Sequence, residues 1–124
     1  MLRQIEICMT VALILYFFAF GIARKYWILH VIAALVGFGL DLYATYLMTV
    51  IEMGPSSWKL ITHTGFSVVA IAWFFVQGGL GLVARTASSI STRKRARQLH
   101  VRCAKWFLAI WIIAFFSGAL LFVH

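Results

Sequence analysis

The sequence predicts an all-α membrane protein, a single domain over residues 1–124 that forms a bundle of four transmembrane helices. Of its residues, 64% are hydrophobic and 11% are charged, whereas soluble domains contain about 25% charged residues. Four stretches are predominantly apolar over about 18 to 25 residues each, and about 20 such residues cross a hydrocarbon core. Helices are expected because lipid offers no partner to backbone N–H and C=O groups.

The four predicted spans are separated by breaks of different chemistry. The spans run over about 5–23, 27–51, 60–84 and 106–123. The first break is the charged pair Arg24-Lys25, and the second is a turn around Pro55, the only proline. The third break, 85–105, is long, polar and basic, so we expect it to be a mobile cytoplasmic loop unless a partner orders it.

The basic residues predict how the spans are oriented. Nine of the eleven Lys and Arg residues lie in or beside the first and third breaks, and only Arg3 and Lys59 lie on the other side. The side rich in Lys and Arg is normally cytoplasmic, so both termini are predicted to lie on the non-cytoplasmic side. Trp27, Trp58 and Trp106 stand where a predicted span begins, as is typical of aromatic residues at membrane interfaces.

A basic cluster, Arg93-Lys94-Arg95-Ala96-Arg97, follows a run rich in Ser and Thr. Each basic residue close to a membrane attracts anionic headgroups by about 1 kcal/mol. We expect Arg97 and Arg102 to contact lipid, with haem propionates or an acidic partner subunit as alternatives. Nucleic-acid binding is not expected, because no aromatic side chains alternate with the charges to stack on bases.

The few polar residues inside the spans are candidates for a functional site, because ionisable groups at membrane depth are rare and usually face the bundle interior. Each of two spans gathers such residues on one face at about 100° per residue. The faces are His30, Gly37, Asp41 and Met48 on the second span, and His63, Ser67, Ala70, Phe74, Gln77 and Gly81 on the third. Small residues on both faces favour close helix approach or a flat macrocycle between helices.

Imidazole and thioether groups are suitable axial ligands for haem iron. His30 and His63 are the leading candidates for the iron ligands, near opposite membrane faces. His100 is the candidate partner of His30, and Met48 or the more distant His124 is that of His63. For each histidine alone, a hydrogen bond to backbone or to lipid phosphate is the alternative role.

Asp41 lies about 21 Å from the cytoplasmic end of the second span, at about 1.5 Å per residue. Three roles stay open for it: a neutral, hydrogen-bonded carboxyl that holds helices together, a proton relay, and a partner for an imidazole. Tyr43 and Tyr46 are close in sequence and are expected in the same layer.

Three segments of the chain resemble a family of small four-span bacterial membrane proteins. The segments are Trp27-Ile28-Leu29-His30, Leu60-Ile61-Thr62-His63 and Leu99-His100-Val101-Arg102. The family is associated in some bacteria with maturation of haem–copper oxidases, and the resemblance covers about 24–123. The family usually has a further histidine near the outer end of the second span, where this sequence has Met48 and Glu52. The arrangement is also similar to four-helix membrane cytochromes of the cytochrome b561 and ferric-reductase kind.

Together, the residues and the resemblance predict a protein of the bacterial inner membrane that binds b-type haem and transfers electrons, or is a cytochrome subunit. The alternative is a cofactor-free accessory or assembly subunit of a larger respiratory membrane complex. A transporter that uses Asp41 is a third class, without internal repeats to support it. A stand-alone hydrolase is not expected, because HExxH, GxSxG and Walker-type motifs are absent.

Overall fold

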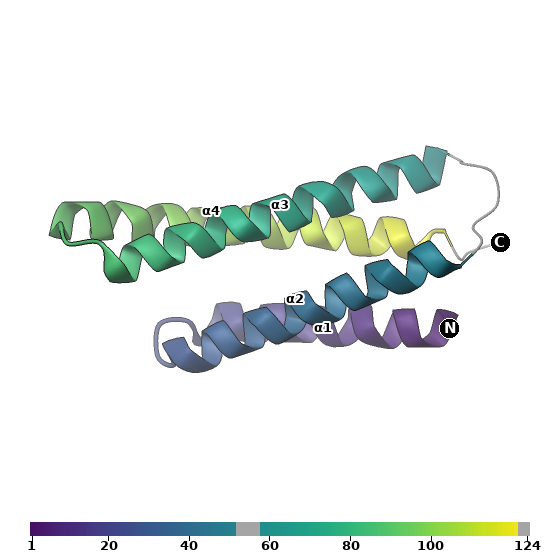
Figure 1. The fold of residues 1–124 in the computed structure, drawn as a ribbon, viewed down its shortest axis with the longest axis horizontal. Coiled ribbons are helices and arrows are strands. Elements are labelled where there is room, and N and C mark those ends of the chain that lie inside the picture. Colours follow the sequence, from purple (N-terminus) through teal and green to yellow (C-terminus); the bar gives the residue numbers. More distant parts are fainter. Residues whose placement is uncertain (52–57, 122–124) are drawn as a thin grey trace. The chain divides into compact units, whose positions relative to one another are not determined.

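The computed structural model consists of four α-helices, and it describes residues 1–51 and 58–121 (Figure 1). The helices are α1 (Leu2–Ile22), α2 (Trp27–Val50), α3 (Trp58–Thr86) and α4 (Ile90–Ala119). Each of the four is long and apolar enough to cross a membrane. The predicted helical fold and its four candidate spans are therefore confirmed. The expected turn around Pro55, and the predictions for Glu52 and His124, fall outside the described residues.

The chain divides into two compact units, Met1–Ser56 and Ser57–His124. In the first unit α1 packs against α2, and in the second α3 packs against α4. Each unit is therefore a helical hairpin, in which two antiparallel helices bury a common interface. Most large apolar side chains face away from that interface; for example, Ile14 on α1 is 61% exposed and Phe75 on α3 is 65% exposed. Such outward apolar surface is what a lipid environment requires.

The α1–α2 hairpin is closed by a tight turn and by small residues. The N–H groups of Lys25 and Tyr26 both donate to the Ile22 carbonyl, at 3.0 and 2.9 Å, and the backbone leaves the helical conformation at Tyr26. The buried residues of the interface include Ala12 and Ala19 on α1, and Ala33, Gly37 and Ala44 on α2. A methyl group on Gly37 would lie 3.2 Å from Cε1 of Tyr16. Glycine at this position thus lets α2 approach the tyrosine ring.

The prediction of a loop over 85–105 is wrong for most of this segment. α4 begins at Ile90, so only 87–89 connect α3 with α4, and the basic cluster stands on a helix. Ser89 caps this helix, because its Oγ accepts a hydrogen bond from the Thr92 N–H at 3.4 Å. The segment 90–105 is polar, but it contains no Gly or Pro and is rich in good helix formers. Polarity alone does not end a helix.

Three contacts fix the antiparallel register of α3 and α4. Side-chain hydrogen bonds join His63 to Ala114, Trp73 to Cys103 and His100 to Gln77. Trp106 therefore lies beside the middle of α3, between the level of Trp73 and that of His63. It does not lie beside Ala84, as it would if the third and fourth predicted spans reached the same membrane interface. The apolar stretches of the two helices are staggered along the hairpin.

Candidate functional site

Three of the four histidines lie in the described residues, and each contacts the backbone of the other helix in its hairpin. The distances are 2.8 Å from His30 Nδ1 to the Ala19 oxygen, 3.0 Å from His63 Nδ1 to the Ala114 oxygen, and 2.6 Å from His100 Nδ1 to the Gln77 oxygen. Because a carbonyl oxygen can only accept, each Nδ1 carries the proton and donates it. The three imidazoles thus point into their hairpins and tie two helices together.

His63 is the most enclosed of the three, with its side chain only 6% exposed. Its Nδ1 also lies 3.1 Å from Ser117 Oγ, and its Nε2 lies 3.5 Å from Ser67 Oγ. A methyl group on Gly118 would lie 2.8 Å from His63 Cε1, which is closer than atoms pack. The ring therefore fills the space that a glycine leaves, and both ring nitrogens have neighbours on α3 or α4.

His100 repeats this arrangement with the two helices exchanged. A methyl group on Gly81 would lie 3.1 Å from His100 Cε1. In both cases the glycine follows the accepting carbonyl by four residues, Gln77 before Gly81 and Ala114 before Gly118. In a helix this residue lies one turn above the carbonyl, where a side chain would stand in the way of the imidazole. The missing side chain therefore gives the histidine access to the backbone.

The polar faces predicted for the second and third spans do turn inward within their hairpins. On α2, His30 and Gly37 face α1, and on α3, His63 and Gly81 face α4. Gln77, included for its amide, contributes its backbone carbonyl to the contact with His100. The helical spacing of about 100° per residue identified the inward faces correctly, because polar side chains of an apolar helix usually face another helix rather than lipid.

The carboxyl group of Asp41 interacts with the hydroxyl of Tyr16, which is a buried residue of α1. Sequence reasoning expected Tyr43 and Tyr46 in this layer, yet these side chains are 48% and 61% exposed. Tyr16 was missed because it lies on another helix. A usable signal was its place in the buried series Ile5, Met9, Ala12, Tyr16 and Ala19, which repeats at helical spacing. A phenol next to a carboxyl group can stabilise a hairpin or hold a proton.

The proposed pairs of haem ligands are divided between the two hairpins. His30 and Met48 belong to Met1–Ser56, whereas His63 and His100 belong to Ser57–His124. Met48 is half-buried on α2, and Arg97 and Arg102 are exposed on α4. Within residues 1–51 and 58–121, no group of three or more His, Cys, Asp or Glu residues is placed to hold a metal ion. Within their own hairpins, His30, His63 and His100 each donate to a backbone carbonyl.

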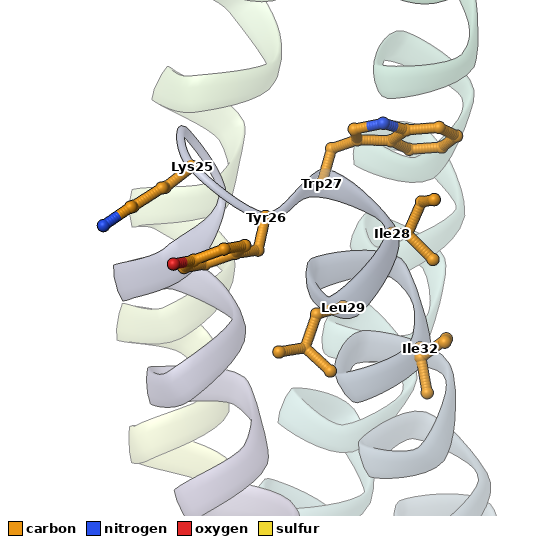
Figure 2. A pocket seen from close by; sticks show the side chains of 6 residues that line it. All are labelled: Lys25, Tyr26, Trp27, Ile28, Leu29 and Ile32. Carbon is orange, nitrogen blue, oxygen red and sulfur yellow. The ribbon is translucent and has the colours of Figure 1, made fainter.

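A hollow of about 340 Å³ lies at the turn between α1 and α2. Its lining consists of Lys25, Tyr26, Trp27, Ile28, Leu29 and Ile32. Figure 2 shows these side chains spreading to both sides of the turn, and Lys25 Nζ lies 5.3 Å from the centre of the Tyr26 ring. Aromatic rings beside a cation are typical of a membrane interface. None of the predicted site residues lines this hollow.

Comparison of the chain with protein-family models, with curated proteins and with solved structures finds no match.

Proposed function

We propose that this chain is an accessory or assembly subunit of a larger membrane complex, with its four helices crossing the membrane. The observation that carries the proposal is that His30, His63 and His100 each donate Nδ1–H to the backbone of a neighbouring helix. Such interhelical hydrogen bonds contribute about 0.6 to 1.7 kcal/mol each inside a membrane. In this role the histidines hold the two helices of each hairpin together, and the helix faces that point away from the hairpin interface bind other proteins.

Glycines on those outer faces support the proposal. In the described part of the chain, a methyl group on Gly39, Gly65, Gly78 or Gly79 would meet no neighbouring atom within 4 Å. Glycine is unfavourable in a helix by about 0.8 to 1.0 kcal/mol relative to alanine. Inside membranes it is enriched where a second helix approaches closely. These positions are suited to partner helices, whereas Gly37, Gly81 and Gly118 are used within the hairpins.

The expected orientation follows from charge and belongs to the same proposal. Both termini lie on the non-cytoplasmic side of a bacterial inner membrane, and the turns at Arg24-Lys25 and 87–89 face the cytoplasm. Lipid and partner subunits then surround the four helices.

A b-type haem protein that transfers electrons is the second candidate. The observation that favours it is the same Nδ1–H···O=C bond, because metal-ligating histidines usually donate their other ring N–H to a carbonyl or carboxylate. In that case His30 and His63 would ligate haem iron, with His100 and Met48 as the further candidates. The iron would supply reversible one-electron chemistry, Arg97 and Arg102 would offer charge to propionates, and Asp41 would be available to relay a proton.

The visible spectrum of the purified protein separates the two candidates. We expect a colourless preparation from haem-replete cells that co-purifies with other membrane subunits. An α-band in the reduced-minus-oxidised spectrum, lost when His30 or His63 is replaced by alanine, would establish the cytochrome and overturn the accessory subunit.

Replacing His63 by two different amide residues tests its role more directly. Asparagine carries its amide nitrogen on Cγ, as histidine carries Nδ1, whereas glutamine places it one atom further out. If His63 acts through Nδ1, His63→Asn should keep more of the unfolding free energy than His63→Gln. A haem ligand predicts a different result, since neither amide replaces imidazole at iron and both variants would lose haem equally.

Replacing exposed glycines by a larger residue tests whether partner subunits bind the outer helix faces. Gly65→Leu and Gly78→Leu should weaken co-purification of partner subunits while leaving the stability of the α3–α4 hairpin nearly unchanged. Val68→Leu, at a side chain that is 60% exposed on the same helix, is the matched control and should retain the partners. Equal loss in all three variants would contradict close approach at the glycines.

A further inference from the structure

The α3–α4 hairpin carries a large positive charge that no Asp or Glu side chain of its own unit balances. Residues Ser57–His124 include eight Lys and Arg residues and no Asp or Glu. All three acidic residues of the protein, Glu6, Asp41 and Glu52, belong to the other unit. A carboxylate side chain that pairs with these cations would therefore have to come from outside the hairpin.

Four of the cations gather at the end of the hairpin where α3 and α4 are joined. We call Arg93, Lys94, Arg95 and Arg97 the basic tip; all four side chains are exposed. Between them, Ala96 is 5% exposed and faces α3. At the opposite end of the hairpin, Lys59 is the only Lys or Arg of the sequence between 57 and 72 or between 106 and 121. The charge is thus concentrated at one end.

The register places an apolar segment of α3 beside the basic tip. Since His100 lies beside Gln77, residues 93–97 of α4 lie beside about 80–84 of α3. This part of α3 is Leu80-Gly81-Leu82-Val83-Ala84, in which Leu82 is 64% and Val83 41% exposed. The end of the hairpin where α3 and α4 are joined (Figure 1) therefore offers an apolar surface on α3 and a cationic surface on α4 at the same level.

The length of the hairpin indicates where this end would lie in a membrane. Helices of 29 and 30 residues measure about 44 Å, whereas the hydrocarbon core is about 30 Å thick. One end must extend into or beyond the headgroup layer, and the charged end does so at the lower cost. Phosphate groups and the upper carbons of acyl chains meet in that layer.

We propose that the basic tip binds anionic phospholipid, with the phosphate on the cations of α4 and the acyl chains against Leu82 and Val83 of α3. A phospholipid matches both surfaces at once, whereas a soluble anion matches only the cations. Nucleic acid is disfavoured because no aromatic side chain lies within the segment 93–97. This assignment is independent of the function proposed above.

Lipid retention by the full-length protein tests the assignment. The protein is reconstituted in nanodiscs of phosphatidylcholine and phosphatidylglycerol, extracted, and the phosphatidylglycerol that stays bound is measured by mass spectrometry. We expect retention to fall by about tenfold or more when Arg93, Lys94, Arg95 and Arg97 are all replaced by Gln. Circular dichroism checks that the variant remains helical, as expected for exposed Gln residues.

Two control variants distinguish the tip from general positive charge. Replacing Arg3 and Lys59 by Gln removes cations elsewhere and should change retention by less than about twofold. Replacing Arg93, Arg95 and Arg97 by Lys keeps the charge and should keep the lipid. Unchanged retention in the Gln variant, or an equal loss in the Arg3 and Lys59 variant, would overturn the proposal.

Competition experiments separate lipid from other anions. Millimolar inorganic phosphate should not displace the bound phosphatidylglycerol, because it cannot use Leu82 and Val83. Displacement by phosphate, or an acidic protein that co-purifies through the tip and excludes lipid, would show that the cations serve a different ligand.

Discussion

The two hairpins of this protein share an architecture but are held together differently. The α1–α2 hairpin has one histidine contact close to its turn, and a polar contact between Tyr16 and Asp41 further along. The α3–α4 hairpin has a histidine contact towards each end, from His63 and His100, and aromatic packing between them. The rings of Phe74 and Phe107, for example, lie 5.8 Å apart.

This difference indicates where substitutions should destabilise each hairpin most. In α3–α4, each helix supplies a histidine to the other and a glycine that receives one, so the ends depend on close fit. In α1–α2, small residues and Gly37 bring the helices together around Tyr16, so the middle depends on the contact of buried Tyr16 with half-buried Asp41. Substitutions at the ends should affect the second hairpin most, and substitutions in the middle should affect the first.

The largest effect is expected at Gly118. Gly118→Ala places a methyl group 2.8 Å from His63 Cε1, so the buried ring must move and weaken its bond to Ala114. We expect the unfolding free energy in detergent micelles to fall by about 2 to 3 kcal/mol.

Gly79→Ala is the matched control, because a methyl group there meets nothing within 4 Å. It should leave stability unchanged or raise it by up to about 1 kcal/mol through helix propensity. If the two alanine variants were equally stable, close fit at the end of the α3–α4 hairpin would not be what holds it.

The next largest effect is expected in the middle of α1–α2. Tyr16→Phe removes the hydroxyl that interacts with Asp41, so a half-buried carboxyl group loses a partner. The expected loss is about 1 to 2 kcal/mol of unfolding free energy, measured as for Gly118. Tyr43→Phe, at a side chain that is 48% exposed, should cost almost nothing.

The role of the Asp41 charge is tested by Asp41→Asn in the same assay. If a neutral carboxyl group accepts from Tyr16, the amide oxygen should replace it and keep most of the stability. A loss as large as that of Tyr16→Phe would instead indicate that the ionised form is required.

A smaller effect is expected at Trp73, whose Nε1–H donates to the Cys103 carbonyl at 2.9 Å. Trp73→Phe keeps most of the apolar surface and loses this bond between α3 and α4, at a cost of about 1 kcal/mol. Trp106→Phe is the control, since Trp106 is 60% exposed in the isolated chain. Similar stability of both variants would argue against the register that places Trp106 beside the middle of α3.

The smallest effect is expected at the start of α4. Ser89→Ala removes the acceptor of the Thr92 N–H and should cost about 0.5 to 1 kcal/mol. Because the loss is local, hydrogen exchange at the Thr92 and Arg93 amides should accelerate, while Ser88→Ala leaves these amides protected. Rapid exchange of both amides in the unmodified protein would favour a loop over a helix.

The helices were predictable because hydropathy is a local property. Runs of apolar residues marked four spans, and the observed helices contain or nearly contain them. The sequence did not predict the start of α4 at Ile90, because the segment 90–105 is polar and was expected to be a loop. Polarity indicates whether a helix is surrounded by water or by lipid, but it does not indicate where the helix begins. Ser89 before a segment free of Gly and Pro was the available signal.

The candidate site was predictable in part. Helical periodicity put His30 and His63 on inward faces, and the structure turns them inward. Periodicity could not predict which residues accept the hydrogen bonds of the two histidines. The acceptors are the backbone oxygens of Ala19 and Ala114, and every residue has such an oxygen. It also suggested Tyr43 for the layer of Asp41, where the structure provides Tyr16 from another helix.

The sequence by itself thus determined the four long apolar helices of this protein, since composition and apolar run length depend only on residues close together in the chain. The tertiary structure alone decided which glycine each histidine meets and how far α4 is displaced along α3. These features depend on how side chains from distant parts of the sequence fit at one interface. The same amino acids in a different register would form equally apolar helices with other contacts.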